Sequence, residues 1–363
     1  MNLRNLAIMV GIIVTVIVAM VLSMPTVSSS AAGKSDSVST ENQKDSRAEA
    51  LPAGTESAGE PARKHRPPSA DLNLFRAILK GEVGPPKEHE NVDYEAFLSK
   101  HGATAVNLIT VFEKTTDRKW LDRALDAFPN SPIVLMTALL EEPREAHPDL
   151  RREWLDRLKH VEPSNPIAWI ISSEKLFKEG RPAEAAAEAA AALERPGFYI
   201  YASERMAAAR SLYENRGIDP LAAELFSMVA LRLPQMSVAA ASSKGLENWK
   251  TAEGTNPADI DEAARIQRGL GKMFQTPEGA RTLIGQLVGI SIETKGLSSL
   301  PADAREKRMA ELEATKAEIH ELSLLLPEGI ISQDDAVMSE YLNRLRTDGE
   351  LSALRRVKAQ HKK

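Results

Sequence analysis

Histidines and paired carboxylates are the first side chains to consider for chemistry in this chain. No two of its seven histidines stand three or four residues apart, which excludes a zinc site built on one helix. They are His65, His89, His101, His147, His160, His320 and His361. The acid groups Glu141-Glu142, Asp334-Asp335 and Asp259/Asp261/Glu262 are adjacent or nearly so. We expect them at helix starts and in solvent, because catalytic carboxylates face one another across a cleft.

Two segments contain part of a chemical motif. Glu318-Ile319-His320-Glu321 has the acid and base of a zinc-protease helix but not its second histidine, so we expect His320 to be a half-exposed structural residue. Gly269-x-Gly271-Lys272 has the glycine and lysine of a phosphate-binding loop, but no strand precedes it. We interpret it as a helix with a weak point.

The remaining chemical signals are absent. The chain has no cysteine, which excludes disulfides, thiol catalysis and cysteine-based zinc sites, and it has no GxSxG element. The sequence therefore predicts no catalytic residue, no cofactor and no metal site. The formal charge of −5 and the pI near 5.9 argue against a nucleic-acid partner. Aromatic residues make up only 5% of the chain, so leucine, isoleucine, alanine and methionine must fill any core.

The N-terminal region carries the clearest local signal. Residues 6–24 contain no charge, and as a helix they would span about 28 Å, close to the hydrocarbon thickness of a bilayer. Arg4 favours a cytoplasmic N-terminus. We expect residues 1–24 to be a transmembrane anchor; the alternative is a signal peptide cleaved near Ser28 to Ala32. Either leads to an extracytoplasmic location, periplasmic if the source is bacterial, or to secretion after cleavage.

Residues 25–70 are predicted to form a disordered linker. They contain no aromatic residue and no isoleucine, and they are rich in Ser, Ala, Glu, Pro and Gly. Such a composition buries too little apolar surface to offset the entropy of ordering the chain.

From Asp71 onward the apolar residues recur at helical spacing, which predicts an all-α fold. Asn256-Pro257 and Thr276-Pro277 each place a capping side chain before a proline, as at the start of a helix. The segment Pro129–Pro132 recurs as Pro163–Pro166, and Pro196-Gly197 follows at a similar interval. This interval matches the period of about 34 residues that is typical of paired short helices.

The segment from Asn165 to Pro196 resembles the tetratricopeptide repeat (TPR) family. Trp169 lies early in the first helix, Gly180 at the turn, and Ala185 and Ala192 where the second helix needs small residues. The next unit has Tyr213, Gly217, Ala222, Phe226 and Pro234, and weaker units surround Trp120 and Trp154. Ser173, Leu176 and the insertion Gly197–Tyr201 depart from the family pattern.

The resemblance implies an α-solenoid of TPR-like helical hairpins over residues 71–250. The alanine-rich stretch between Gly180 and Pro196 would be a second helix that lets its neighbours come close. An alanine-rich helix of an unrelated bundle is the alternative.

Residues 251–363 are predicted to form a C-terminal helical region. The sequence favours helices at about 257–274, 277–296, 301–325 and 334–358. The uncharged run from Thr282 to Ile292, with Gly285 and Gly289, is too short to cross a membrane and predicts a buried helix at a close crossing. Leu312, Ile319 and Leu326 fall seven apart and indicate a packed hairpin that closes the solenoid.

The resemblance also implies a function. It predicts a membrane-anchored or exported scaffold that binds a protein or peptide through the inner groove of the first helices. The candidate groove residues are Glu174, Phe177, Lys178, Glu204, Ser211 and Glu214, and Phe198, Tyr199 or Tyr201 could act as an anchor. A cell-envelope enzyme with a site between the solenoid and the C-terminal helices, and a self-associating structural spacer, are the alternatives. The oligomeric state is left open.

Overall fold

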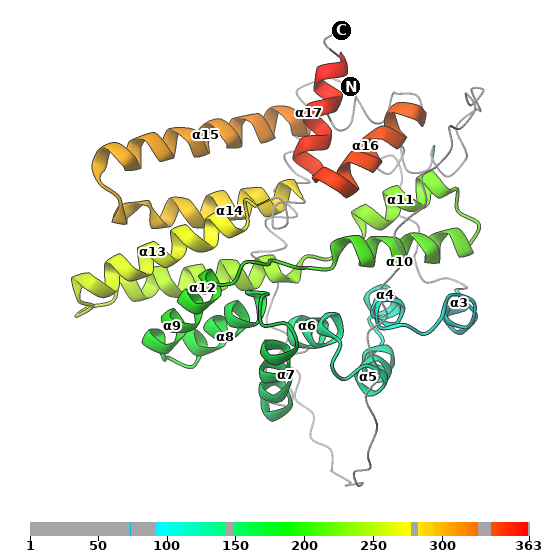
Figure 1. Ribbon diagram of the computed structural model, residues 1–363, viewed down its shortest axis with the longest axis horizontal. Coiled ribbons are helices and arrows are strands. Elements are labelled where there is room, and N and C mark those ends of the chain that lie inside the picture. Colours follow the sequence, from blue (N-terminus) through cyan, green and yellow to red (C-terminus); the bar gives the residue numbers. More distant parts are fainter. Residues whose placement is uncertain (1–72, 74–91, 142–147, 277–281, 326–334, 362–363) are drawn as a thin grey trace. The chain divides into compact units, whose positions relative to one another are not determined.

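The structure is a computed structural model that describes residues 73, 92–141, 148–276, 282–325 and 335–361. These residues form fifteen α-helices and one short 3-10 helix and contain no strand, so the described part of the chain is all-α as predicted (Figure 1). The predicted anchor (6–24) and linker (25–70) lie outside the described residues. None of the described helices is long and apolar enough to cross a membrane.

Helices α3 to α9 follow one another as short neighbouring helices. In each of the pairs α4/α5, α6/α7 and α8/α9 the second helix packs against the first, and α6 and α8 also contact the preceding pair. The bounds are α3 Tyr94–His101, α4 Ala105–Thr115, α5 Arg118–Ala127, α6 Pro132–Glu141, α7 Pro148–Val161, α8 Ile167–Lys178 and α9 Pro182–Leu193.

Local sequence explains the α8/α9 turn. Gly180 has a φ of 72°, a left-handed conformation that glycine adopts without a steric penalty, and Pro182 begins α9 at its first helical position. On α9, Ala185, Ala189 and Ala192 are fully buried. The alanine-rich segment is therefore a helix that packs closely against its neighbours, as predicted.

The helices that follow α9 pack back onto earlier helices of the chain. Helix α10 (Ala202–Asn215) and helix α11 (Pro220–Val229) fold back at Gly217, whose φ is 80°. Helix α10 packs against α4, and α12 (Pro234–Lys250) packs against α8 and contacts α6. Surfaces of the first helices α4, α6 and α8 are thus covered by α10 and α12 of the same chain (Figure 1).

Glycines set the crossing of α13 (Pro257–Met273) and α14 (Leu283–Gly296). A Cβ atom at Gly289 would lie 2.7 Å from the backbone oxygen of Gly271, and one at Gly296 would lie 2.4 Å from that of Ala264. The predicted close crossing is confirmed at Gly289, and Gly296, which the sequence did not indicate, makes a second close contact. Helix α13 runs unbroken through Gly269 and Gly271, so these glycines mark contacts with α9 and α14 rather than a weak point.

Asn256 caps α13 as predicted: its side chain accepts a hydrogen bond from the Asp259 N–H at 2.9 Å. The corresponding Thr276-Pro277 signal reaches residues outside the described ranges, because Pro277 is not described.

The C-terminal helices are α15 (Ala302–Leu325), α16 (Asp335–Asp348) and α17 (Glu350–His361), after the 3-10 turn Leu297–Ser299. The single helix predicted for residues 334–358 is wrong. Gly349 has a φ of 83°, which ends α16 and lets α17 fold back on it. Leu312 and Ile319 are buried as the sevenfold spacing predicts, whereas Leu326 lies outside the described residues.

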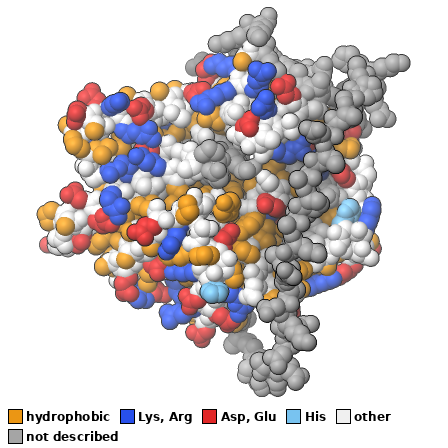
Figure 2. Space-filling view, in the orientation of Figure 1, with side chains coloured by type: hydrophobic (Ala, Val, Ile, Leu, Met, Phe, Trp, Pro, Cys, Tyr) orange, Lys and Arg blue, Asp and Glu red, His pale blue; other side chains and the backbone are white. Residues whose placement is uncertain are grey.

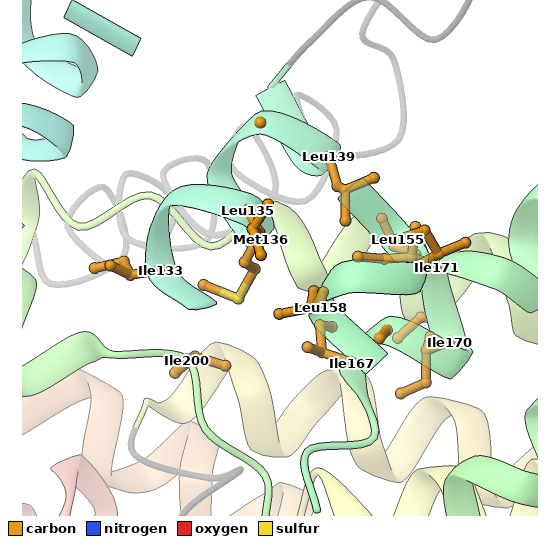
Figure 3. Packing of buried hydrophobic residues seen from close by; sticks show 14 of the residues in the cluster. Ile133, Leu135, Met136, Leu139, Leu155, Leu158, Ile167, Ile170, Ile171 and Ile200 are labelled. Atoms are coloured by element: carbon orange, nitrogen blue, oxygen red, sulfur yellow. The ribbon is translucent and has the colours of Figure 1, made fainter. Parts of the chain in front are cut away.

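Two apolar cores hold these helices. The first spans α3 to α10 and α12 to α14, and isoleucines, leucines and methionine of α6, α7 and α8 interdigitate in it (Figure 3). The second joins α10 and α11 to α14 through α17. Both cores consist mostly of Leu, Ile, Ala and Met, as expected for a chain with few aromatic residues.

Candidate functional site

The predicted groove residues on α8 contact other residues of the same chain. Glu174 is buried and its carboxylate lies 2.8 Å from the ammonium group of Lys178, which is exposed. The Phe177 ring packs against the backbone of α12 at Gly245, where a Cβ atom would overlap it. One turn earlier, the hydroxyls of Ser173 and Ser242 share a buried hydrogen bond of 2.9 Å. Helix α12 thus covers this surface of α8.

The predicted residues on α10 belong to a different neighbourhood. Ser211 donates to the carbonyl oxygen of Ala207 at 3.1 Å, Glu214 accepts from Arg210 at 2.7 Å, and Glu204 is exposed. Because α10 packs against α4 while α8 packs against α12, the two predicted sets lie on helices with different neighbours.

The aromatic residues of the insertion have separate roles. Phe198 is buried edge-on against Phe274, with ring centroids 4.7 Å apart. Tyr201 donates to the Glu162 carboxylate at 2.5 Å, and burial raises the pKa of its phenol. Of the three, Tyr199 alone is well exposed, at 49%, and able to contact another molecule.

Open space lies instead along the second helices of the hairpins. A hollow of about 550 Å³, here named the α7–α9 hollow, is lined by α7, α9 and the facing side of α8. A smaller one of about 270 Å³, the α5–α7 hollow, lies between α5 and α7. Each hollow is open to solvent, and its size falls near the range of small-ligand sites.

The walls of the two hollows repeat with the period of the sequence. The tetrapeptide Trp-Leu-Asp-Arg occurs at 120–123 on α5 and again at 154–157 on α7, one repeat period later. Arg118 and Asp122 line the α5–α7 hollow, and Arg152 and Asp156, displaced by the same interval, line the α7–α9 hollow. This repeated tetrapeptide is the sequence signal that could have indicated the surface along α5, α7 and α9, here called the outer surface.

The alanines of α9 explain why the α7–α9 hollow is larger than the α5–α7 hollow. Ala191 lies 34 residues after Arg157, and a methyl group lines the α7–α9 hollow where a long side chain lines the α5–α7 hollow. Ala187 likewise corresponds to Glu153. The buried face of α9 packs against the core, and its outer face leaves space between consecutive hairpins.

The floor and rim of the α7–α9 hollow are chemically mixed. Trp169 forms part of the floor, with Lys159 Nζ 5.5 Å and Arg195 Cζ 4.4 Å from its ring centre. Lys159 also pairs with Glu188 at 2.6 Å. Four basic and four acidic side chains line the hollow, so no single charge dominates it. They are Arg152, Lys159, Lys175, Arg181, Asp156, Glu179, Glu184 and Glu188.

Ion pairs fix one end of this rim. Arg181 donates to Glu184 at 2.8 Å and 2.5 Å and to Glu179 at 3.1 Å. These hydrogen bonds raise the pKa of Arg181, and the hydrogen bond from Arg181 lowers the pKa of Glu184. Figure 2 shows acidic and basic side chains interspersed on the face of the molecule that it presents.

Carboxyl groups with a raised pKa occur elsewhere. Burial raises the pKa of Glu113 on α4 despite its ion pair with Arg205, and burial raises the pKa of Glu350 at the start of α17. Neither residue lines either hollow. In the part of the chain that the structure describes, no group of three or more His, Asp or Glu side chains is placed to hold a metal ion.

Comparison with protein-family models, curated proteins and solved structures finds no match for this chain.

Proposed function

We propose that this chain is a helical-repeat scaffold that binds other proteins outside the cytoplasm. Its TPR-like hairpins would form a solenoid over residues 71–250, and the apolar segment 6–24 would hold it at a membrane through the linker 25–70. The observation that carries the proposal is the periodic recurrence of hollow walls between neighbouring hairpins, from Arg118 and Asp122 to Arg152 and Asp156.

The proposal places the binding surface on the second helices. Helices α10 and α12 contact α4, α6 and α8, the surface that the resemblance assigns to a partner. The outer surface of α5, α7 and α9 carries the hollows and a mixture of charged and apolar side chains. Such a mixture suits a protein partner, because protein interfaces combine an apolar centre with a polar rim.

Affinity capture from membranes tests the proposal. The tagged full chain, crosslinked before extraction, is compared with a variant that fills the hollow, Ala187→Glu, which restores the residue that α7 carries one repeat earlier. We expect mass spectrometry to identify proteins whose recovery falls at least about tenfold with this variant, as for a residue at the centre of an interface. Ala183→Glu, at an exposed position one turn earlier on α9, is the matched control and should leave recovery unchanged.

Equal recovery with wild type and Ala187→Glu would remove the outer surface from consideration. The membrane part of the proposal has a separate test, in which a reporter enzyme active only outside the cytoplasm is fused after Lys363. Loss of reporter activity when residues 1–24 are deleted supports export through this segment, and unchanged activity contradicts it. Recovery of the undeleted fusion at full length in the membrane fraction supports the anchor, and a shortened, released fusion contradicts it.

A further inference from the structure

One strip of α7 has a charge pattern with a definite symmetry. Asp149, Arg152, Asp156 and Lys159 are spaced three, four and three residues apart, which places them along one side of the helix. Their charges read minus, plus, minus, plus from one end to the other. Reversing the direction of the helix about its midpoint at Trp154 therefore exchanges every charge for its opposite.

Two of these charges lack partners that their counterparts possess. On α5, Arg118 and Asp122 are four residues apart and form an ion pair of 2.7 Å. On α7, Arg152 and Asp156 have the same spacing and the same place in the next repeat, but neither forms an ion pair with a residue that the structure describes. Both are exposed and both line the α7–α9 hollow.

The wall opposite this strip is shaped to admit a bulky neighbour. Ala187 and Ala191 of α9 present only methyl groups toward the hollow. The half-buried Leu176 and the small accessible parts of Leu155 and Trp169 form its apolar floor. A groove flanked by small residues beside a charged ridge is the geometry in which two helices pack, each ridge resting in the other's groove.

We propose that a second copy of this chain binds here, with its α7 antiparallel to the first and each α7 resting in the other's α7–α9 hollow. A two-fold axis through the midpoint of the helix pair would place Arg152 opposite the partner's Asp156 and Asp149 opposite the partner's Lys159. The surface that a two-fold dimer uses must be complementary to itself, which this strip is. The balanced charge of the hollow fits the same occupant better than a strongly acidic or basic ligand.

Charge and apolar contacts have different parts in this dimer. Exposed ion pairs add little affinity, so their main effect is to fix the antiparallel register and to exclude the parallel one. Apolar surface would be buried where each α7 rests on the alanine methyl groups and the apolar floor of the other copy's hollow. This self-association goes beyond the proposed function, which requires a different protein as partner.

Charge exchange tests the pairing. The purified full chain in detergent is measured by light scattering over a concentration series, with the mass of bound detergent subtracted. We expect concentration-dependent dimers for the wild type. Arg152→Asp and Asp156→Arg should each weaken dimerisation by at least about tenfold, because each change creates two like-charge contacts across the axis. The double variant R152D/D156R should restore it.

Matched changes on α5 separate this interface from a general charge effect. The variants R118D and D122R alter the equivalent residues of the preceding repeat and should leave dimerisation unchanged. A monomeric wild type at every concentration overturns the proposal, as does a dimer that none of the α7 variants weakens. Failure of the double variant to recover overturns the antiparallel pairing. Both proposals use the α7–α9 hollow, so a dimer and another bound protein would compete for it. Recovery of other proteins in the membrane capture and dimerisation in light scattering are separate readouts, so failure of one proposal is distinguished from failure of the other.

Discussion

Gly271, Gly289 and Gly296 let α13 and α14 come very close. At each glycine, atoms of the facing helix occupy the space that a Cβ atom would fill. At Gly271 the atoms that meet an added methyl group belong to the backbone and Cβ of Glu293, which cannot move aside by rotating a side chain. This contact fixes the spacing of the two helices, and it also holds the buried Glu293 beside Arg308, 2.8 Å away.

Gly271→Ala is therefore expected to destabilise the protein despite the better helix propensity of alanine. The cost should be about 1–3 kcal/mol, as for other overpacked cores. Urea denaturation measures it, and Ser291→Ala, at an exposed position on α14, is the control that should change stability little. A variant as stable as wild type would show that the helices can separate without loss.

Glu350 provides a prediction about pH. Its carboxylate accepts a hydrogen bond of 2.7 Å from the Leu283 N–H at the start of α14, and burial raises its pKa. A pKa that is higher in the folded state means that the ionised form is disfavoured there. Glu350 therefore contributes to the free energy of unfolding through its protonated form. This contribution is complete at pH values below the carboxyl pKa of the unfolded chain, and it is lost as the pH rises through the pKa of Glu350 in the folded protein.

Glu350→Gln keeps an acceptor for Leu283 and removes the charge. We expect the variant to be at least as stable as wild type at neutral pH, and its advantage to shrink as the pH falls toward the ordinary range of a carboxyl group. Unfolding free energies across a pH series measure the difference. A variant less stable at neutral pH than in acid, relative to wild type, would contradict this sign.

At the scale of elements, the docking of α10 on α4 depends on buried polar contacts. Arg205 pairs with Glu113, and Lys114 donates to the Tyr213 hydroxyl at 2.7 Å with its ammonium group 4.9 Å from the ring centre. Arg205 is only 4% exposed. Removing one charge of such a pair leaves the other buried alone, which is costly, whereas replacing both with apolar groups is often nearly neutral.

The variant R205M should therefore lose about 3 kcal/mol or more of stability, and the double variant R205M/E113L should recover most of that loss. A double-mutant cycle by chemical denaturation measures the coupling between the two positions. If the single and double variants lose the same free energy, the ion pair does not hold α10 against α4.

Sequence patterns predicted the local elements well because their signals are local. Asn256, Gly180 and Pro182 act within one turn of their own helix, and the structure places each of them where the pattern requires. Gly349 was overlooked inside a helical pattern, although its left-handed conformation divides that segment into α16 and α17.

The packing of distant elements could not be predicted in this way. The repeat period indicates hairpins, but it does not say which helix covers α8. That choice depends on the fit of Phe177 against Gly245 and of Ser173 against Ser242, residues that lie far apart in the sequence. The candidate groove is what the TPR resemblance implies, and that resemblance specifies a helix face but not which helix covers it.

At the scale of the whole molecule, contacts group the chain into two units, Met1–Pro68 and Ser69–Lys363. We expect a chain that starts at Ser69 to fold alone, because the two described cores lie wholly within the second unit. Its thermal midpoint should agree with that of the full chain in the same detergent within about 2 °C, roughly the shift that 1 kcal/mol produces in a unit of this size. A lower midpoint would show that the unit Met1–Pro68 stabilises the fold.

The position of α12 along α8 has a consequence for inhibitors and competing peptides. A helix carried by the same polypeptide meets its groove at an effective concentration that can reach the order of millimolar. A free helix of equal intrinsic affinity, supplied at micromolar levels, would displace only a small fraction of it. The surface of α8 that α12 covers therefore behaves as though saturated by a ligand that dilution cannot remove. A molecule selected for binding to this protein should bind elsewhere.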